Sequence, residues 1–80
     1  MNIFISNLNF RLKEEDLVKL FAEYGEVESL RIITDKFSGR SKGFGFVEMS
    51  DEAGKAAIEA LNGVEIEGRT INVAPARPRN

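Results

Sequence analysis

The octapeptide at residues 42–49, Lys-Gly-Phe-Gly-Phe-Val-Glu-Met, constrains the fold more than any other stretch of this sequence. Side chains alternate between the two faces of a strand, so Phe44 and Phe46 share one face with the lysine and the glutamate. Burying an unpaired lysine or glutamate is costly, whereas the glycine face suits close approach by another element. We therefore predict a strand that presents Phe44 and Phe46 to solvent as a binding surface.

Residues 2–6 repeat this pattern in a second predicted strand. Ile3 and Ile5 share one face, whereas Phe4 shares the other face with an asparagine and a serine. Because those neighbours are polar, the same argument predicts that Phe4 lies on the open face.

Two segments have the apolar spacing of amphipathic helices. In residues 13–24 the apolar side chains recur at intervals of three and four, and Gly25 is a suitable C-terminal stop. The second helix is expected to begin at Ser50 or Asp51 and to run to about Asn62. Its expected buried face is small, consisting of Gly54, Ala57, Ile58 and Leu61. Such small residues would let this helix lie close to the glycines of the octapeptide.

Two further strands are predicted at residues 27–34 and 70–74. In the first segment Leu30 and Ile32 are expected to face the core, whereas Ile33 is expected to face outward. In the second segment Ile71 and Val73 are expected to face the core. The alternation directs Arg31 outward in the first segment, and it directs Asn72 and Ala74 outward in the second.

The predicted order is strand, helix, strand, strand, helix, strand. This order is typical of an α+β, ferredoxin-like βαββαβ sandwich with a four-stranded antiparallel sheet. Right-handed crossovers place both helices on one face and leave the other face bare. We expect one domain over residues 1–76 and a short basic C-terminal tail at residues 77–80.

Three apolar residues fall in predicted loops. Leu8 and Phe10 follow the first strand, and both are expected to cover the edge of the core. Phe37 lies in the polar loop 35–41, where either local packing or contact with a ligand would explain it. Of these two explanations, we predict local packing.

The absence of cysteine and histidine limits the chemistry available to the chain. It excludes a disulfide framework and a thiolate zinc site, and it removes the commonest general base and metal ligand. We therefore expect no metal, no cofactor and no enzymatic activity. No apolar run approaches the ~20 residues that cross a bilayer, and no signal-peptide pattern is present, so a cytoplasmic location is expected.

The net charge of −2 at pH 7 and the pI of about 5.1 argue against bulk attraction to nucleic acid. The distribution of charge points the other way. Residues 31–42 carry four basic side chains against one acidic side chain, and the tail contains Arg77 and Arg79. A mixed solvated surface and a true electrostatic asymmetry both fit this distribution.

Together these segments resemble an RNA recognition motif over nearly the whole chain. The octapeptide matches the family signature K/R-G-F/Y-G/A-F-V-x-F/Y except at Met49, which replaces the last aromatic residue at a core position. Residues 3–8, Ile-Phe-Ile-Ser-Asn-Leu, resemble the second signature of the family. In that family the two signature strands are central neighbours in the sheet.

The resemblance implies a role for each matching residue. Phe4 and Phe46 would be stacking platforms for bases, and Phe44 would pack against a sugar or an adjoining base. Lys42 would hold a phosphate. The implied function is binding of single-stranded RNA in RNA metabolism or post-transcriptional regulation, since unpaired bases can splay onto a sheet whereas a duplex cannot.

Flanking residues would complete the interface. Arg31, Arg40 and Arg77 would neutralise phosphates and make binding salt-dependent. Asn72 and Ala74 match the C-terminal base-contacting stretch of the family.

The main alternative is a protein-interaction module that uses the same aromatic face, because the net charge is acidic. Cold-shock domains share a K-G-F-G-F run, but they are all-β barrels, which the two helical patterns exclude. An acylphosphatase-like enzyme would need a phosphate loop, and the glycine, lysine and hydroxyl spacing does not form one. A monomer without a membrane partner is expected, and competition by single-stranded DNA is left open.

Overall fold

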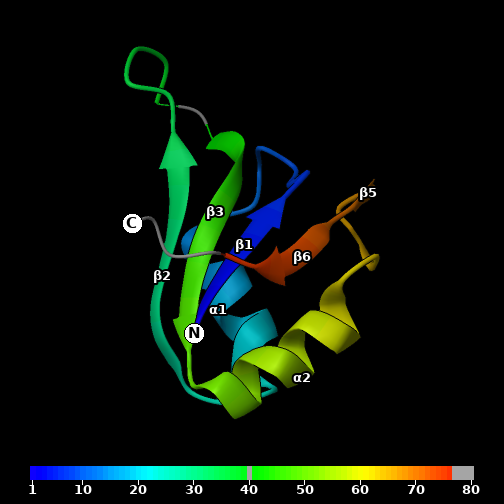
Figure 1. The fold of residues 1–80 in the computed structure, drawn as a ribbon. Helices are drawn as coiled ribbons and strands as arrows, with labels where there is room; N and C mark the ends of the chain where they lie inside the picture. The colour runs from blue at the N-terminus through cyan, green and yellow to red at the C-terminus, as the bar shows by residue number, and fades with distance from the viewer. Residues whose placement is uncertain (40, 77–80) are drawn as a thin grey trace.

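The computed structural model describes residues 1–39 and 41–76, with Ser41 and Lys42 described only through their backbone (Figure 1). Its elements, in chain order, are β1 (Asn2–Ser6), α1 (Glu14–Ala22), β2 (Val27–Thr34), β3 (Ser41–Met49), α2 (Asp51–Leu61), β4 (Glu65–Ile66), β5 (Arg69–Thr70) and β6 (Asn72–Pro75). Both helices lie on one side of an antiparallel sheet with strand order β2-β3-β1-β6, which confirms the predicted fold class.

The hairpin β4–β5 was not predicted as a pair of strands. Its turn forms at Glu67 and Gly68, which both have positive φ, 53° and 79°. Thr70 pairs with Glu65 in this hairpin, and for this reason the last sheet strand begins at Asn72 rather than at residue 70.

The core lies between the sheet and the helices. Ile3 and Ile5 of β1 are fully buried, and they pair in register with Val47 and Gly45 of β3. Met49 is also fully buried, as expected for its position in the octapeptide. The helices contribute a second set of buried side chains, Leu17, Phe21, Ala57 and Leu61.

Each helix begins with a side-chain hydrogen bond at its first turn. The Asp16 carboxylate accepts from the Lys13 backbone N–H at 3.1 Å, and the Ser50 hydroxyl accepts from the Ala53 N–H at 3.2 Å. These contacts satisfy N–H groups that have no partner within the helix. The structure thus identifies Ser50, not Asp51, as the N-cap of α2.

The prediction that α2 packs on the octapeptide glycines is wrong. A methyl group on Gly54 would meet the Met1 side chain and lie 3.4 Å from Ile3 Cδ1. Gly43 instead faces the Leu8 backbone, and Gly45 faces the neighbouring strand β2. The glycines of β3 therefore permit close approach within the sheet and by the β1–α1 loop.

Two loop predictions are also wrong. Phe10 is 59% exposed, because Leu8 and Leu12 are the buried residues that close this edge of the core. Phe37 is fully exposed, since its turn is held by the Asp35 carboxylate, which accepts from the Phe37 N–H at 2.8 Å, and not by packing of the ring. Over residues 1–39 and 41–76, neither helix has the length and apolar character needed to cross a membrane.

Candidate nucleic-acid interface

Three phenylalanines form a cluster on the face of the sheet that the helices leave uncovered. Phe4 of β1 is directly opposite Phe46 of β3, and their ring centroids are 5.4 Å apart. The centroid of the Phe44 ring, which also belongs to β3, lies 5.9 Å from the centroid of the Phe4 ring. Phe4 and Phe44 are half-buried, and Phe46 is 42% exposed. The predicted face of all three rings is therefore confirmed.

The register of four strands extends this cluster into a row across the sheet. Arg31 of β2 is paired with Phe46, Phe46 with Phe4, and Phe4 with Ala74 of β6. Paired residues in an antiparallel sheet point to the same face, so this row carries one cation, two rings and one small side chain. Arg31 and Ala74 are exposed, as predicted.

A second row runs parallel to the first. Phe44 pairs with Ser6, and Ser6 pairs with Asn72. Asn72 is exposed at the β6 edge, so its amide can offer both donors and an acceptor to a ligand on the face. The two rows together give a surface with aromatic rings at the centre and polar groups around them.

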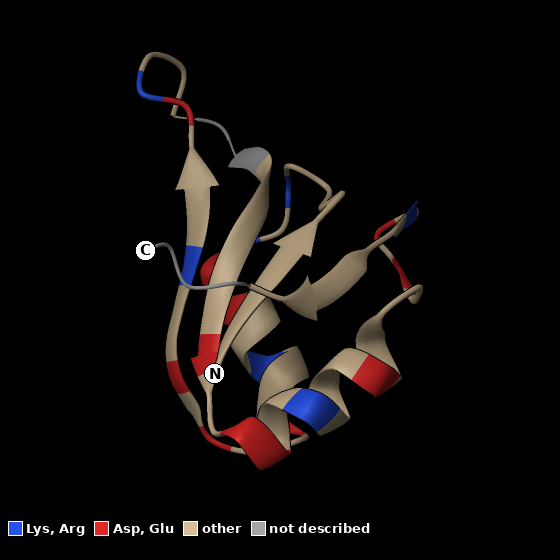
Figure 2. Cartoon of the chain, viewed as in Figure 1, with Lys and Arg blue, Asp and Glu red and all other residues tan. Residues whose placement is uncertain are grey.

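The electrostatics of this face are mixed (Figure 2). Arg31 and Glu48 both line a surface depression of about 350 Å³ next to Phe46. The α2 side of the molecule carries Asp51, Glu52 and Glu59, all exposed. Acidic residues thus lie mainly away from the rings, with Glu48 as an exception on the face itself.

Some predicted contacts cannot be placed. Arg40 and Arg77 lie outside the described residues. The backbone of Lys42 belongs to β3, but its side chain is not among those described. Their roles as phosphate contacts stay predictions from the sequence.

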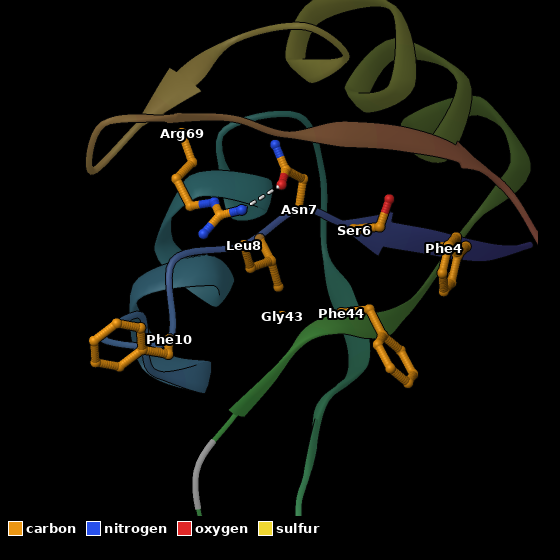
Figure 3. A pocket seen from close by; sticks show the side chains of 8 residues that line it. All are labelled: Phe4, Ser6, Asn7, Leu8, Phe10, Gly43, Phe44 and Arg69. Carbon is orange, nitrogen blue, oxygen red and sulfur yellow. Dashed lines mark hydrogen bonds between the residues drawn. The ribbon is translucent and has the colours of Figure 1, made fainter.

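A pocket at the loop end of the sheet contains residues that the sequence did not point to as functional (Figure 3). It has a volume of about 460 Å³, and we refer to it as the loop-end pocket. Its lining consists of Phe4, Ser6, Asn7, Leu8, Phe10, Gly43, Phe44 and Arg69. The available signal was Phe10 itself, an aromatic residue between Asn9 and Arg11 in a polar turn.

No metal-binding arrangement of acidic side chains occurs among residues 1–39 and 41–76. The described groups of the face are aromatic rings, amides, a hydroxyl, a guanidinium group and the Glu48 carboxylate. Such groups bind through stacking, hydrogen bonding and charge.

A model of the RNA recognition motif family matches residues 3–72. The chain is 48% identical to "Putative RNA-binding protein RbpE" of Nostoc sp. (strain PCC 7120 / SAG 25.82 / UTEX 2576) over 80 residues, covering 99% of this chain and 81% of that protein. It is 46% identical to glycine-rich RNA-binding protein blt801 of Hordeum vulgare over 77 residues, covering 95% of this chain and 48% of that protein.

Solved structures have the same fold. The crystal structure of RNA binding protein PG1 superposes with a TM-score of 0.92 at 52% identity, covering 100% of this chain and 98% of that one. The Sxl-lethal protein/RNA complex has a TM-score of 0.92 at 30% identity, covering 99% of this chain and 48% of that one.

Proposed function

Because the chain belongs to the RNA recognition motif family, we propose that the open face of its sheet binds single-stranded RNA by stacking bases on Phe4 and Phe46. The observation that carries this proposal is the row formed by Arg31, Phe46 and Phe4 on three adjacent strands. It sets two platforms side by side and a cation at the end of the row. A strand of unpaired nucleotides offers matching bases and phosphates.

The physical basis of this binding is stacking. Every base has an aromatic face, so each ring contributes roughly 1–3 kcal/mol without demanding a particular base. Phe44 packs against a sugar or an adjoining base, and Asn72 and Ala74 contact the bases at the β6 edge. Arg31 neutralises a phosphate, which makes the affinity depend on salt.

The remaining assignments rest on the sequence. Lys42, Arg40 and Arg77 are proposed as further phosphate contacts. Residues 1–76 are proposed as the binding domain and residues 77–80 as a basic tail. We propose a role in RNA metabolism or post-transcriptional regulation without catalysis. A cytoplasmic location, a monomeric state and single-stranded DNA as a second ligand stay predictions.

The double variant Phe4→Ala, Phe46→Ala tests the proposal. Losing two platforms should weaken binding of single-stranded RNA roughly ten-fold to ten-thousand-fold, as measured by fluorescence anisotropy. The variant should remain folded in urea titrations, because a ring on the open face costs far less than the ~3–5 kcal/mol of a buried Phe→Ala change. Val18→Ala, an exposed change on α1, is the matched control and should bind like the parent.

A second double variant, Phe4→Leu, Phe46→Leu, keeps apolar bulk on the face and removes only the aromatic rings. This variant controls for loss of binding that is caused by unfolding. It should also bind single-stranded RNA more weakly than the parent. If both double variants fold and bind RNA as before, the stacking proposal is wrong. The protein-interaction alternative would then account for the exposed rings, and a partner would be sought by pull-down.

A further inference from the structure

We propose that the loop-end pocket receives one further base of the bound RNA strand, stacked on Phe10, with the polar groups of that nucleotide on Arg69. This inference rests on the proposed function, and it adds a subsite at the loop end of the four-stranded sheet. The pocket shares two walls, Phe4 and Phe44, with the proposed stacking surface (Figure 3). A strand bound at Phe44 is therefore already next to the pocket.

Phe10 is placed to bind because the core does not use it. Leu8 and Leu12 are buried and close the core at this edge, whereas Phe10 is 59% exposed. Phe10 lines the same pocket as Phe4 and Phe44, so the exposed aromatic surface continues from the sheet onto the loop, as is typical of a contact surface. In Figure 3 the Phe10 ring lies at the outer edge of the pocket, on the opposite side of Leu8 from Phe44.

The loop that carries Phe10 is held in place by hydrogen bonds. The Leu8 N–H donates to the Gly43 carbonyl at 2.8 Å, and the Leu12 N–H donates to the Asn9 carbonyl at 3.0 Å. The Asn9 side chain accepts from the Arg11 N–H at 2.9 Å. A ring on a fixed loop loses little conformational entropy when a base stacks on it.

Arg69 comes to the pocket from β5, and Asn7 fixes its guanidinium group. Arg69 Nη2 donates to Asn7 Oδ1 at 2.9 Å, and Asn7 Nδ2 donates to the Thr70 carbonyl at 2.7 Å. Asn9 Nδ2 also donates to the Glu67 carbonyl at 2.9 Å. Two asparagine amides thus dock the β4–β5 hairpin onto the β1–α1 loop.

The chemistry of the pocket fits a nucleotide. Its floor is the buried Leu8, its walls are aromatic, and its polar side is a guanidinium group with N–H groups beyond the one bonded to Asn7. Arg11 adds positive charge, with its guanidinium carbon 5.9 Å from the Phe10 ring centroid. A pocket volume of about 460 Å³ lies within the usual range of small-molecule sites.

The test combines protein variants with abasic RNA. Anisotropy is measured for an eight-nucleotide RNA and for a set of RNAs that each lack one base. Phe10→Ala should weaken binding of the intact RNA by roughly five-fold to one-hundred-fold. At one abasic position the parent should lose affinity, whereas Phe10→Ala should lose no more. That position should differ from those coupled in the same way to Phe4 and Phe46.

Arg69→Gln distinguishes the two kinds of acceptor that a nucleotide offers. Loss of affinity with a salt slope smaller by about one charge would identify a phosphate contact. Loss confined to RNAs with guanine at the coupled position, with the salt slope unchanged, would identify a base edge. Either result supports the subsite. Lys55→Gln on α2 is the charge-matched control, and Phe10→Leu controls for folding of the loop.

The outcomes separate the two proposals. If the parent binds no RNA, or if the Phe4 and Phe46 double variants bind normally, the proposed function fails and the subsite fails with it. If those double variants lose binding while Phe10→Ala and Arg69→Gln bind like the parent, only the subsite is overturned. Coupling of Phe10 to no abasic position would overturn it as well.

Discussion

At position 45 the sheet has room for a hydrogen atom and no more. A methyl group there would place its carbon 2.5 Å from the Arg31 carbonyl oxygen and 3.2 Å from Ile32 Cα, both on β2. These are backbone atoms, so a rotamer change cannot relieve the overlap. Gly45 therefore permits the close approach of β2, the strand on which Arg31 is paired with Phe46.

Gly45→Ala should destabilise the domain by roughly 1–3 kcal/mol, because β2 and β3 must move apart to admit the methyl group. Urea unfolding measures the effect. Ser29→Ala, an exposed change on β2, should stay within ~0.5 kcal/mol of the parent. An unchanged stability for Gly45→Ala would mean that the two strands are farther apart than the structure has them.

Among the elements, α2 has the better-defined start. Ser50 accepts a hydrogen bond from the Ala53 N–H, and Asp51 and Glu52 lie in the first turn near the positive end of the helix dipole. The helix covers the sheet opposite the phenylalanine cluster through Ala57 and Leu61. Loss of this cap should therefore affect folding while leaving the binding surface itself unaltered.

Ser50→Ala should lower the free energy of unfolding by about 0.5–2 kcal/mol, since it removes the only side-chain acceptor seen at this helix start in the described residues. Ser29→Ala makes the same chemical change without a cap and is the matched control. RNA affinity measured under native conditions should not change for Ser50→Ala. A wild-type unfolding midpoint would show that solvent replaces the cap at no cost.

At the scale of the whole molecule, the buried core and the proposed binding surface lie on opposite faces of the sheet. The helices cover one face of the sheet (Figure 1). The three phenylalanine rings lie on the other face. The acidic net charge is carried largely by loops and helices (Figure 2). If RNA binds the open face as proposed, its attraction depends on local cations there and is opposed by Glu48.

Glu48→Gln should strengthen RNA binding, on the order of two-fold to five-fold at low salt, because it removes a negative charge two residues from Phe46 on the same face. The gain should shrink as salt rises. Glu59→Gln on α2 makes the same change in net charge in the helix layer, and it should have little effect on binding. Equal gains from both variants would mean that net charge matters and position does not.

The face of the sheet could be predicted from sequence because side-chain alternation is a local property of any strand. The polar neighbours of Phe4 and Phe46 were sufficient to assign both rings to the open face. The same reasoning placed Arg31, Asn72 and Ala74 correctly on that face. The element order in turn determined the fold, since few topologies satisfy right-handed crossovers.

Only the tertiary structure decided what lies around the loops. Asn7 and Arg69 are 62 residues apart, and Asn7, which accepts the hydrogen bond from Arg69, has a φ of 61° just after β1. Phe10 was expected in the core because its apolar character is visible in the sequence, whereas the competing burial of Leu12 is not. Contacts between distant loops follow from individual turns and side-chain amides, which carry no periodic signal. The loop-end pocket is a product of those contacts.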